Sequence, residues 1–404
     1  MQTPKKVLYI DGVGPFGGAS RSLFEAVARL KKNNAVTPYF LNSRGTANDY
    51  YATIAEDTTL TQGLSRFDNT RYSHYRGLRW LVLAREVFHL PFTIAAIFKS
   101  KKKWDHFDLV HINEITEIIP GLIASRIFKC PLIVHVRSLQ SEKKNLRTAW
   151  INKALKKSAG IVCIDETVSR TIPENINKTV IHNSFTIESD KKDKKIEEKL
   201  KIHGNKFRVG FVGNLQEIKG IIELAQASAI LKNREDIVFL IVGDDTEKKS
   251  FFRKVAEKLL GLSQDTKERI IRIIEENKIQ DKFILLGRTG DISTAYKNFD
   301  VLCFPSHLDA PGRPVFESAF FQIPSIVCVE SPTPDTVIPG KTALTIPEKN
   351  PEALANAILY LADSPEDRNE MGQNAYQLAL SNFDPERNSQ KLQLFYNSVL
   401  LERS

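Results

Sequence analysis

The sequence has 404 residues, of which 42% are hydrophobic, 26% charged and 9% aromatic. This composition is typical of a folded globular protein and excludes the disordered, collagen-like and disulfide-scaffold classes, while the length favours two domains. The four cysteines stand singly in apolar runs without a CxxC pair, so neither a zinc site nor a disulfide framework is indicated. The net charge of +9 points to an acidic partner such as nucleic acid, anionic lipid or a phosphorylated substrate.

The start of the chain runs directly into a strand-like segment, without the charged and apolar regions of a signal peptide. No run of about 18 uncharged apolar residues predicts a transmembrane helix. We therefore expect a cytoplasmic protein, with peripheral attachment to the cytoplasmic face of a membrane as an option. The first 110 residues hold 16 Lys and Arg against 9 Asp and Glu, so most of the excess charge lies there.

The first half of the sequence alternates strands and helices. Residues 6–10 (KVLYI) predict a buried strand, a glycine-rich turn follows, and apolar residues at helical spacing begin near residue 20. Further strand-like runs lie at 36–41, 108–112, 131–136, 160–164 and 179–181. This alternation predicts a parallel sheet with crossover helices.

The highly charged segment 186–206 is expected to be a linker, because it lacks an apolar stripe wide enough for a core. The alternation then restarts, with strands at 207–213, 238–244, 283–287, 301–305 and 324–329 and a helical tail from about 351. We expect an N-terminal domain at 1–185, a C-terminal domain at 207–380, and a last helix at 381–404 that is able to pack back on the first domain. Ligands of two such α/β lobes are expected in the cleft between them.

Two turns between a strand and a helix are candidates for phosphate binding. GPFGGAS at 14–20 lacks the spacing of the dinucleotide fingerprint, and a glycine-rich turn without a ligand is an equal alternative. In FVGNLQEIKGIIEL at 211–224, Lys219 lies where the helix begins and suits a diphosphate. The alternative for Lys219 is a solvated lysine at a helix start.

The segment FPSHLDAPGRPVFESAFFQIPSIV at 304–327 carries the most information. Asp309 lies in the loop after a strand, a helix starts near Pro314, and Glu317 lies in its first turn. Both carboxylates can face one cleft, where their oxygens suit pairs of sugar hydroxyls. The alternative is a turn residue at 309 and a helix-dipole partner at 317.

In family order, these motifs make the chain resemble the retaining glycosyltransferases of family 4, which have the GT-B fold. The resemblance rests on VGNLQEIKG, VGD at 242–244, LLGR at 285–288 with FDVLCFPS, and the Asp309–Glu317 block with QIPSIV. It extends weakly to GGAS at 17–20, DLVHI at 108–112 and IHNSF at 181–185. It implies an α/β protein with two Rossmann-like lobes, and a hexose donor with UDP favoured over GDP.

The resemblance also implies roles for residues of the second lobe. Asp309, which replaces the usual Glu, would lie near the transferred sugar, and Glu317 would hold the ribose. Lys219 matches the family's diphosphate lysine. Asn214 stands where the family has an arginine, and we hypothesise that Arg313, beside Gly312, supplies the missing charge.

Arg288 matches the position of the nucleobase contact, and a solvent-facing role is the alternative. In the first lobe, the main-chain N–H groups of Gly17 and Gly18 would assist the diphosphate.

His135 and Arg137 alternate on one strand, and the family often has a histidine near this strand end, facing the transferred sugar. By spacing Arg137 occupies that place, so both residues are candidates; a satisfied core histidine is the alternative for His135. Asn113 and Glu114 end the preceding strand and are candidates for the acceptor side. We expect no metal ion or other cofactor, since no Asp-x-Asp motif is present, and we assign no protein nucleophile.

Segment 71–103 contains eight basic residues and one acidic residue, Glu86, interleaved with apolar and aromatic side chains. Such a segment suits an anionic membrane surface and a lipid-linked acceptor, and it is expected to form two helices interrupted by Pro91. The alternative is a core helix with a solvated basic face.

Three function classes follow. The leading one is transfer of a sugar from a nucleotide-sugar to a glycan or lipid-linked acceptor in surface polysaccharide or glycoconjugate synthesis. A GT-B nucleotide-sugar epimerase and a non-catalytic nucleotide-sugar-binding subunit are the alternatives. Nucleic-acid binding is not expected, because the basic cluster has no known recognition motif.

Overall fold

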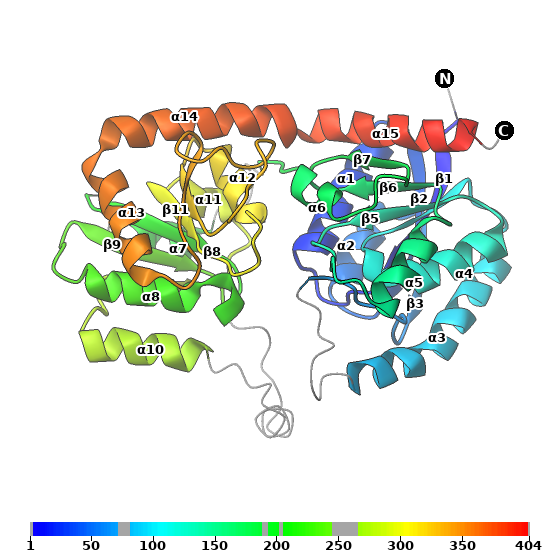
Figure 1. Cartoon of the computed structure of the whole chain (residues 1–404), viewed down its shortest axis with the longest axis horizontal. Coiled ribbons are helices and arrows are strands. Elements are labelled where there is room, and N and C mark those ends of the chain that lie inside the picture. The colour runs from blue at the N-terminus through cyan, green and yellow to red at the C-terminus, as the bar shows by residue number, and fades with distance from the viewer. Residues whose placement is uncertain (1–2, 72–80, 188–192, 202–204, 245–265, 403–404) are drawn as a thin grey trace. The chain divides into compact units, whose positions relative to one another are not determined.

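The computed structural model describes residues 3–71, 81–187, 193–201, 205–244 and 266–402. The chain divides into two compact units, one of residues 1–186 with 383–404 and one of residues 187–382. Each unit is built around one parallel β-sheet with helices on both faces (Figure 1). The last 22 residues therefore belong to the same unit as the N-terminus.

The first unit has a seven-stranded sheet in the order β3-β2-β1-β4-β5-β6-β7. Its strands are β1 (Lys5–Asp11), β2 (Val36–Ser43), β3 (Asp57–Thr61), β4 (Leu109–Ile112), β5 (Leu132–Val136), β6 (Gly160–Cys163) and β7 (Lys178–Val180). Its helices are α1 (Gly18–Lys32), α2 (Ala47–Ile54), α3 (Leu81–Lys103), the 3-10 turn η2 (Ile115–Glu117), α4 (Ile118–Phe128), α5 (Leu146–Leu155), α6 (Glu166–Arg170) and α15 (Pro385–Leu401).

The apolar run of β1 is buried on both faces, as expected for the centre of a parallel sheet. Leu8 and Ile10 join the core beneath α3, α4 and α5, whereas Val7 and Tyr9 join the core beneath α1, α2 and α15. Helix α15 thus completes one face of this unit, lying against α1.

The second unit has a six-stranded sheet in the order β10-β9-β8-β11-β12-β13. Its strands are β8 (Phe207–Val212), β9 (Ile237–Val242), β10 (Phe283–Gly287), β11 (Val301–Phe304), β12 (Ser325–Val327) and β13 (Ala343–Thr345). Its helices are α7 (Lys194–Lys201), the 3-10 turn η3 (Glu217–Lys219), α8 (Ile221–Ile230), α10 (Thr266–Asn277), α11 (Ile292–Tyr296), α12 (Arg313–Ala319), α13 (Pro351–Asp363) and α14 (Pro365–Asn382).

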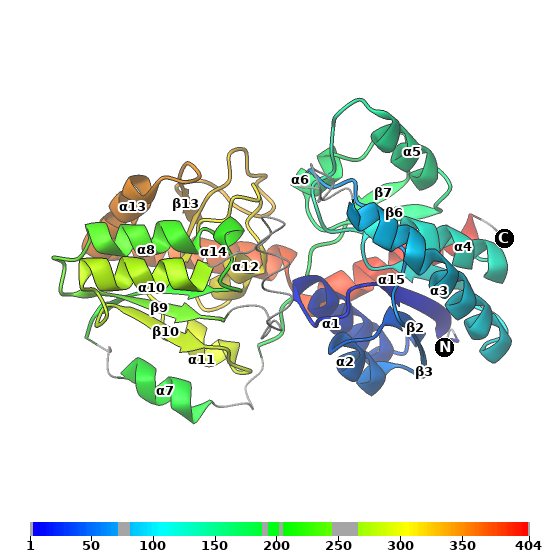
Figure 2. The same cartoon turned by 90° about the horizontal axis from the view of Figure 1, so that it is seen from below.

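The strands of this sheet also have two buried faces. In β9, Phe239 and Ile241 face the core shared with α8, α10 and α13, while Val238 and Leu240 face the core shared with α7, α11 and α12. Helices α8 and α10 run side by side over the first of these faces (Figure 2).

Two segments differ from the sequence predictions. The charged segment 186–206, expected to be a linker, contains helix α7, whose Ile196 and Leu200 are buried in the core of the second unit. Two apolar side chains one turn apart are enough to dock a short helix on a preformed core. Helix α3 is continuous through Pro91, although two helices were expected. Pro91 lies on the exposed side, where water can satisfy the carbonyl that loses its partner.

Candidate functional site

In both sheets the strand order reverses direction next to a central strand. These switch points lie between β1 and β4 in the first unit and between β8 and β11 in the second. Open parallel sheets bind ligands at the carboxyl ends of the strands beside such a point. The candidate residues follow these strands: Gly17 and Gly18 after β1, Asn113 and Glu114 after β4, Lys219 after β8, and Asp309 after β11.

In the second unit, the loop after β8 is fastened to the loop after β11. Ser306 Oγ and the His307 N–H both donate to the Ile218 carbonyl, at 3.2 and 2.9 Å. Gly220 has a φ of +73°, and a side chain there would overlap the Pro305 carbonyl oxygen. A glycine is therefore required at 220, and it places Lys219 beside the end of β11.

Lys219 is a partly buried cation at the end of the loop after β8. Its Nζ lies 5.4 Å from the centre of the Phe304 ring, and burial lowers the pKa of its ammonium group. Within the described part of the chain, no carboxylate forms an ion pair with Lys219. A cation held in this way is suited to an anionic ligand, because the site supplies no internal counter-ion.

Glu317 has partners for both of its carboxylate oxygens. Arg313 Nε donates to Oε1 and the Tyr296 hydroxyl donates to Oε2, both at 2.8 Å. The side chains of Arg313 and Glu317 are 11% and 6% exposed, so the ion pair is largely shielded from water. Arg313 and Glu317 are four residues apart on α12, so their side chains lie on the same side of the helix and can form an ion pair. This ion pair was not predicted from the sequence.

Asp309 has a left-handed backbone with a φ of +48°, a conformation that Asp and Asn tolerate better than most residues. Its Oδ1 accepts the Glu330 N–H at 2.9 Å, which connects this loop to the segment after β12. Gly312 also has a positive φ, +53°, and a side chain there would lie 2.6 Å from the Phe304 ring. Asn214 and Arg288 are both exposed, after β8 and β10 respectively.

Gly17 and Gly18 are exposed at the start of α1, and Gly17 is the N-cap without a side-chain capping bond. Gly17 has an ordinary extended backbone, and a Cβ at this position would have no described atom within 4 Å. The fold of this unit does not require glycine at position 17. A glycine that packing does not explain leaves room for close approach to the main-chain N–H groups.

A chain of buried polar side chains connects α15 with the ends of β4 and β5. The Tyr396 hydroxyl lies 2.5 Å from His111 Nδ1, His111 Nε2 lies 3.3 Å from His135 Nδ1, and Arg137 Nη2 lies 3.3 Å from the same His135 Nδ1. Burial, reinforced by the Arg137 charge, lowers the pKa of His111 to about 3 and that of His135 well below its usual value. Both imidazoles are therefore neutral.

The hydrogen-bond pattern assigns their tautomers. Arg137 only donates, so His135 Nδ1 is an acceptor and the His135 proton lies on Nε2. His111 then donates from Nε2 and accepts the Tyr396 proton at Nδ1. Within the described part of the chain, His135 Nε2 is buried and has no hydrogen-bond partner. The His135 Nε2–H group is thus a donor from which a ligand oxygen can accept a hydrogen bond.

Arg137 also holds the two acceptor-side candidates, Asn113 and Glu114, through hydrogen bonds. Its Nε donates to the Asn113 carbonyl and to Asn113 Oδ1, at 3.0 and 2.9 Å, and its Nη1 donates to Asn183 Oδ1 at 2.6 Å. Glu114 accepts the Ser138 hydroxyl at 3.1 Å, and burial raises the pKa of Glu114 to about 7.

Several members of these networks were not predicted from the sequence. His111 stands singly in the apolar strand β4, and a lone polar residue at a core position of a strand is the signal that identifies it, whereas Tyr396 lies in α15 among many polar residues and has no such signal. Asp11 and Glu117 are also fully buried, and they bond to the Ser20 hydroxyl and the Gly12 N–H. These two carboxylates shape the glycine-rich turn after β1. In the described residues, no group of three or more His, Cys, Asp or Glu is placed to hold a metal ion.

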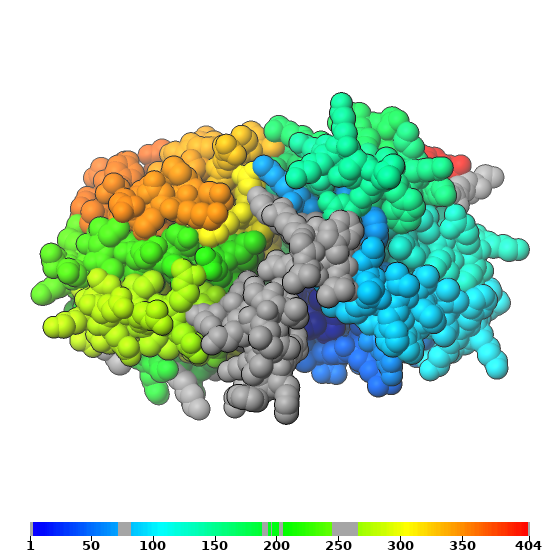
Figure 3. All heavy atoms as spheres, turned by 60° about the horizontal axis from the view of Figure 1, so that its bottom comes forward, coloured from blue at the N-terminus to red at the C-terminus, as the bar shows by residue number. Residues whose placement is uncertain are grey.

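The exposed side of α3 carries a stripe of apolar side chains, Val87, Phe88, Ile94 and Phe98, which are 36–65% exposed. Lys99 and Lys102 are exposed at its C-terminal end, and Figure 3 shows this helix in light blue on the molecular surface. The opposite side of α3 packs on α4 and β3. Residues 72–80 of the predicted basic segment lie outside the described residues. No helix of the described chain is both long and apolar enough to cross a membrane.

Residues 192–378 match the family model described as glycosyl transferases group 1. This segment is a group 1 glycosyltransferase domain. The chain is 25% identical over 300 residues to the capsular polysaccharide biosynthesis glycosyltransferase CapM of Staphylococcus aureus, which covers 70% of this chain and 74% of CapM. It is 21% identical to the D-inositol 3-phosphate glycosyltransferase of Corynebacterium glutamicum, over 96% of this chain and 93% of that enzyme. The chain is therefore a glycosyltransferase.

The fold of this glycosyltransferase is shared along its whole length with solved structures. The crystal structure of Anabaena HepE in complex with UDP-glucose matches 98% of this chain and 100% of HepE, with a TM-score of 0.74 at 18% identity. The two parallel sheets of seven and six strands are those of the two Rossmann-like lobes of GT-B glycosyltransferases, as the sequence predicted.

Proposed function

We propose that this protein is a retaining hexosyltransferase of family 4 that transfers a sugar from a nucleotide-sugar, with UDP favoured over GDP. The observation that carries the proposal is the partly buried Lys219, which forms no ion pair with any described residue. It lies in the loop after β8, which is hydrogen-bonded to the loop after β11 at the switch point of the second unit. The UDP and UDP-glucose complexes of HepE, which shares the fold, support the choice of nucleotide.

In the proposed donor complex, Lys219 and Arg313 face the diphosphate, Glu317 accepts the ribose hydroxyls, and Asp309 lies at the transferred sugar. Each carboxylate oxygen has two lone pairs, so Glu317 can accept ribose hydroxyls while keeping Arg313 and Tyr296. Arg288 contacts the base, and Asn214 and Gly312 line the site without charge. The N–H groups at Gly17 and Gly18 assist the diphosphate at the N-terminus of α1.

The proposed chemistry needs no protein nucleophile and no metal ion. Positive charge and N–H donors stabilise the leaving diphosphate, which gains charge in the transition state. The acceptor hydroxyl attacks on the face that the diphosphate leaves, so the anomeric configuration is retained. In this proposal, His135 Nε2–H and Arg137 orient the transferred sugar or the attacking hydroxyl, and Asn113 and Glu114 lie on the acceptor side; the unpartnered His135 Nε2 among the described residues and the bond from Arg137 to Asn113 support these roles.

The proposal is tested by incubating the purified protein with UDP-glucose, UDP-N-acetylglucosamine or GDP-mannose and candidate glycan or lipid-linked acceptors. We expect one donor to be used, with retention of the anomeric configuration in the product NMR spectrum. Asp309→Asn tolerates the backbone and keeps the acceptor for the Glu330 N–H, so it is expected to fold and to lose about 100-fold in kcat/KM. Inversion would contradict the proposal. Donor rearrangement without acceptor would favour the epimerase, and binding without turnover would favour a binding subunit.

We also propose that the exposed apolar stripe of α3 binds an anionic membrane surface, where a lipid-linked acceptor is available. The stripe of Val87, Phe88, Ile94 and Phe98 with neighbouring Lys99 and Lys102 has the apolar and basic character of interfacial helices. The protein is expected to sediment with vesicles containing phosphatidylglycerol, less so at high salt, and Phe88→Ser with Phe98→Ser is expected to abolish the effect. Equal sedimentation with neutral and anionic vesicles would contradict it.

A further inference from the structure

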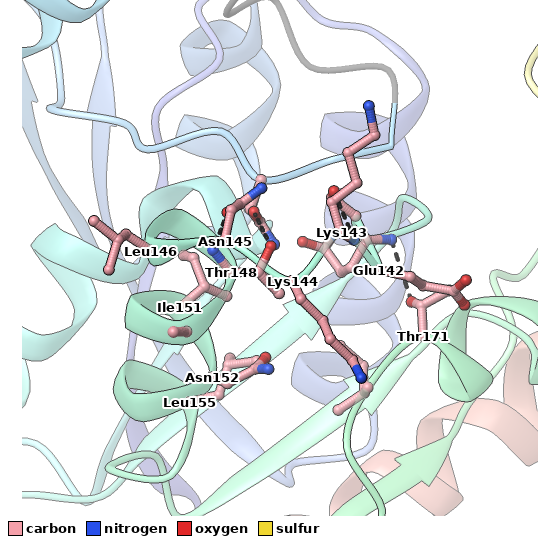
Figure 4. Close-up of a pocket in the computed structure, with 15 residues that line it drawn as sticks. Glu142, Lys143, Lys144, Asn145, Leu146, Thr148, Ile151, Asn152, Leu155 and Thr171 are labelled. Atoms are coloured by element: carbon pink, nitrogen blue, oxygen red, sulfur yellow. Dashed lines mark hydrogen bonds between the residues drawn. The ribbon is translucent and has the colours of Figure 1, made fainter.

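The first unit contains a pocket that the roles above do not use. It has a volume of about 580 Å³ and lies between the loop after β5, helix α5 and the end of α6. Figure 4 shows Ile151, Asn152 and Leu155 on the side of α5 that faces it. Its size falls within the range of small-molecule sites and accommodates one or two sugar rings.

The polar lining of this pocket consists of amides and hydroxyls. Asn69, Gln140, Asn145 and Asn152 supply amides, and Ser141, Thr148 and Thr171 supply hydroxyls. Ile151, Leu155 and Ile172 form apolar surface among them. Amides and hydroxyls both donate and accept, which matches the hydroxyl groups of a sugar, and apolar surface suits the C–H faces of its ring.

One buried acceptor in the lining lacks a partner. Gln140 is 3% exposed, and its Nε2 donates to the Ser138 carbonyl at 2.8 Å. Its Oε1 has no hydrogen-bond partner among the described residues. Asn69 is 1% exposed and is held by Thr148 and by the Ser141 N–H. A buried oxygen without a donor is costly, so a bound hydroxyl group would stabilise this site.

Ser138 connects the wall of the pocket with the candidate acceptor side of the same unit. Ser138, whose carbonyl holds Gln140, donates its hydroxyl to Glu114. The loop after β5 therefore carries Arg137 and Ser138, which contact Asn113 and Glu114, and also Gln140, which lines the pocket.

The charges at the pocket are mixed and exposed. Glu142, Lys143 and Lys144 follow one another along the lining and sum to a single positive charge. All of the side chains that form the buried wall are uncharged. This distribution favours a neutral ligand over a phosphorylated one.

We propose that this pocket binds a neutral, hydroxyl-rich saccharide unit of the acceptor, one or two residues long. The inference rests on the proposed glycosyltransferase function and names the chemistry of its acceptor. It assigns recognition of the sugar to the amides of the lining, which belong to Asn69, Gln140, Asn145 and Asn152. The lysines at the rim contribute little to this recognition.

The test uses a panel of neutral di- and trisaccharides. Saturation-transfer difference NMR measures the binding of each saccharide to the full-length protein. We expect at least one panel member to bind the wild type. Asn152→Ala is expected to weaken its binding about tenfold, and Asn152→Trp, which fills the pocket, to abolish it. Lys153→Ala, an exposed neighbour outside the lining, is the matched control and is expected to bind as the wild type does.

UDP binding, measured on the same variants, separates this proposal from the proposed function. Unchanged UDP affinity with lost saccharide binding supports the pocket assignment. If no panel saccharide binds, or if Asn152→Trp binds as well as the wild type, the assignment is overturned whatever the UDP result. Loss of binding in Lys143→Ala with Lys144→Ala, but not in Asn152→Ala, would overturn it in favour of an anionic ligand. Absent binding of both UDP and GDP would instead overturn the proposed function.

Discussion

At the scale of single residues, the buried pair of Arg313 and Glu317 combines a structural and a proposed binding role. Their carboxylate and guanidinium groups are 2.8 Å apart and largely shielded, and Glu317 also holds Tyr296. Arg313 therefore holds the Glu317 carboxylate in a fixed position, which in the proposed complex faces the ribose. In the proposed complex, the same guanidinium compensates for the uncharged Asn214.

Arg313→Ala is expected to lower the free energy of unfolding by about 2–3 kcal/mol, because it leaves a buried carboxylate with only the Tyr296 hydroxyl. Arg313→Lys is expected to retain more stability and part of the donor affinity. Chemical denaturation and donor titration measure the two effects. Unchanged turnover and donor affinity in Arg313→Ala would rule out its role at the diphosphate.

Glu114 gives a prediction for pH. Its folded pKa of about 7 exceeds the ordinary value of 4.5, so the folded state binds more protons between these values. The contribution of this group to the free energy of unfolding therefore has its maximum below pH 4.5, and it is lost as the pH rises toward 7. The pH profile of Glu114→Gln should lack this loss, which we expect to be about 2 kcal/mol for a partly exposed group. Parallel profiles of wild type and variant would contradict the assignment.

At the scale of elements, strand ends and helix starts could be predicted from the sequence, because apolar β-branched runs and glycine-rich turns are local signals. The Lys219 turn after β8 and the Asp309 loop after β11 lie where these signals indicated. Two features could not be predicted. Docking of α7 depends on a core built by distant strands, and the continuity of α3 depends on Pro91 being solvent-exposed.

Gly17 and Gly220 form a matched pair of glycine substitutions. Gly220→Ala is expected to destabilise the second unit by more than 1 kcal/mol, since the left-handed backbone and the Pro305 carbonyl both oppose a side chain. Gly17→Ala meets open space, so it is expected to leave the melting temperature unchanged and to weaken donor binding. Thermal denaturation with and without UDP measures both effects. Undiminished UDP stabilisation of Gly17→Ala would argue against diphosphate contact at α1.

Tyr396 extends the site to the C-terminal helix. Tyr396→Phe removes the proton that His111 Nδ1 accepts and frees the histidine tautomers along the network. We expect a fall in kcat of about tenfold, with donor affinity and the fold of α15 retained. The pH dependence of kcat should change as well, which a purely packing role would not produce. Wild-type kcat and pH profile would refute the positioning role.

At the scale of the whole molecule, the length and the alternation of strands and helices predicted two α/β domains, and the structure has two units with parallel sheets of seven and six strands. The hydrogen-bond partners of the buried polar residues could not be predicted from the sequence. The His111–His135–Arg137 network and the Gln140 pocket join residues of separate elements, and such long-range pairs leave no spacing pattern. Two groups of the basic residues behind the net charge of +9 have proposed roles. These are Lys219 at the proposed donor site and the lysines of α3 at the proposed membrane surface.

The central claim is that the second unit binds a nucleotide diphosphate through Lys219. Isothermal titration calorimetry of UDP into the full-length protein tests it most directly, with Lys219→Ala as the variant and Lys232→Ala, an exposed lysine of the same unit, as its control. We predict micromolar to millimolar binding to wild type and to Lys232→Ala, and at least tenfold weaker binding to Lys219→Ala with unchanged stability. Equal UDP affinity in all three proteins, or no UDP binding to the wild type, would contradict the account.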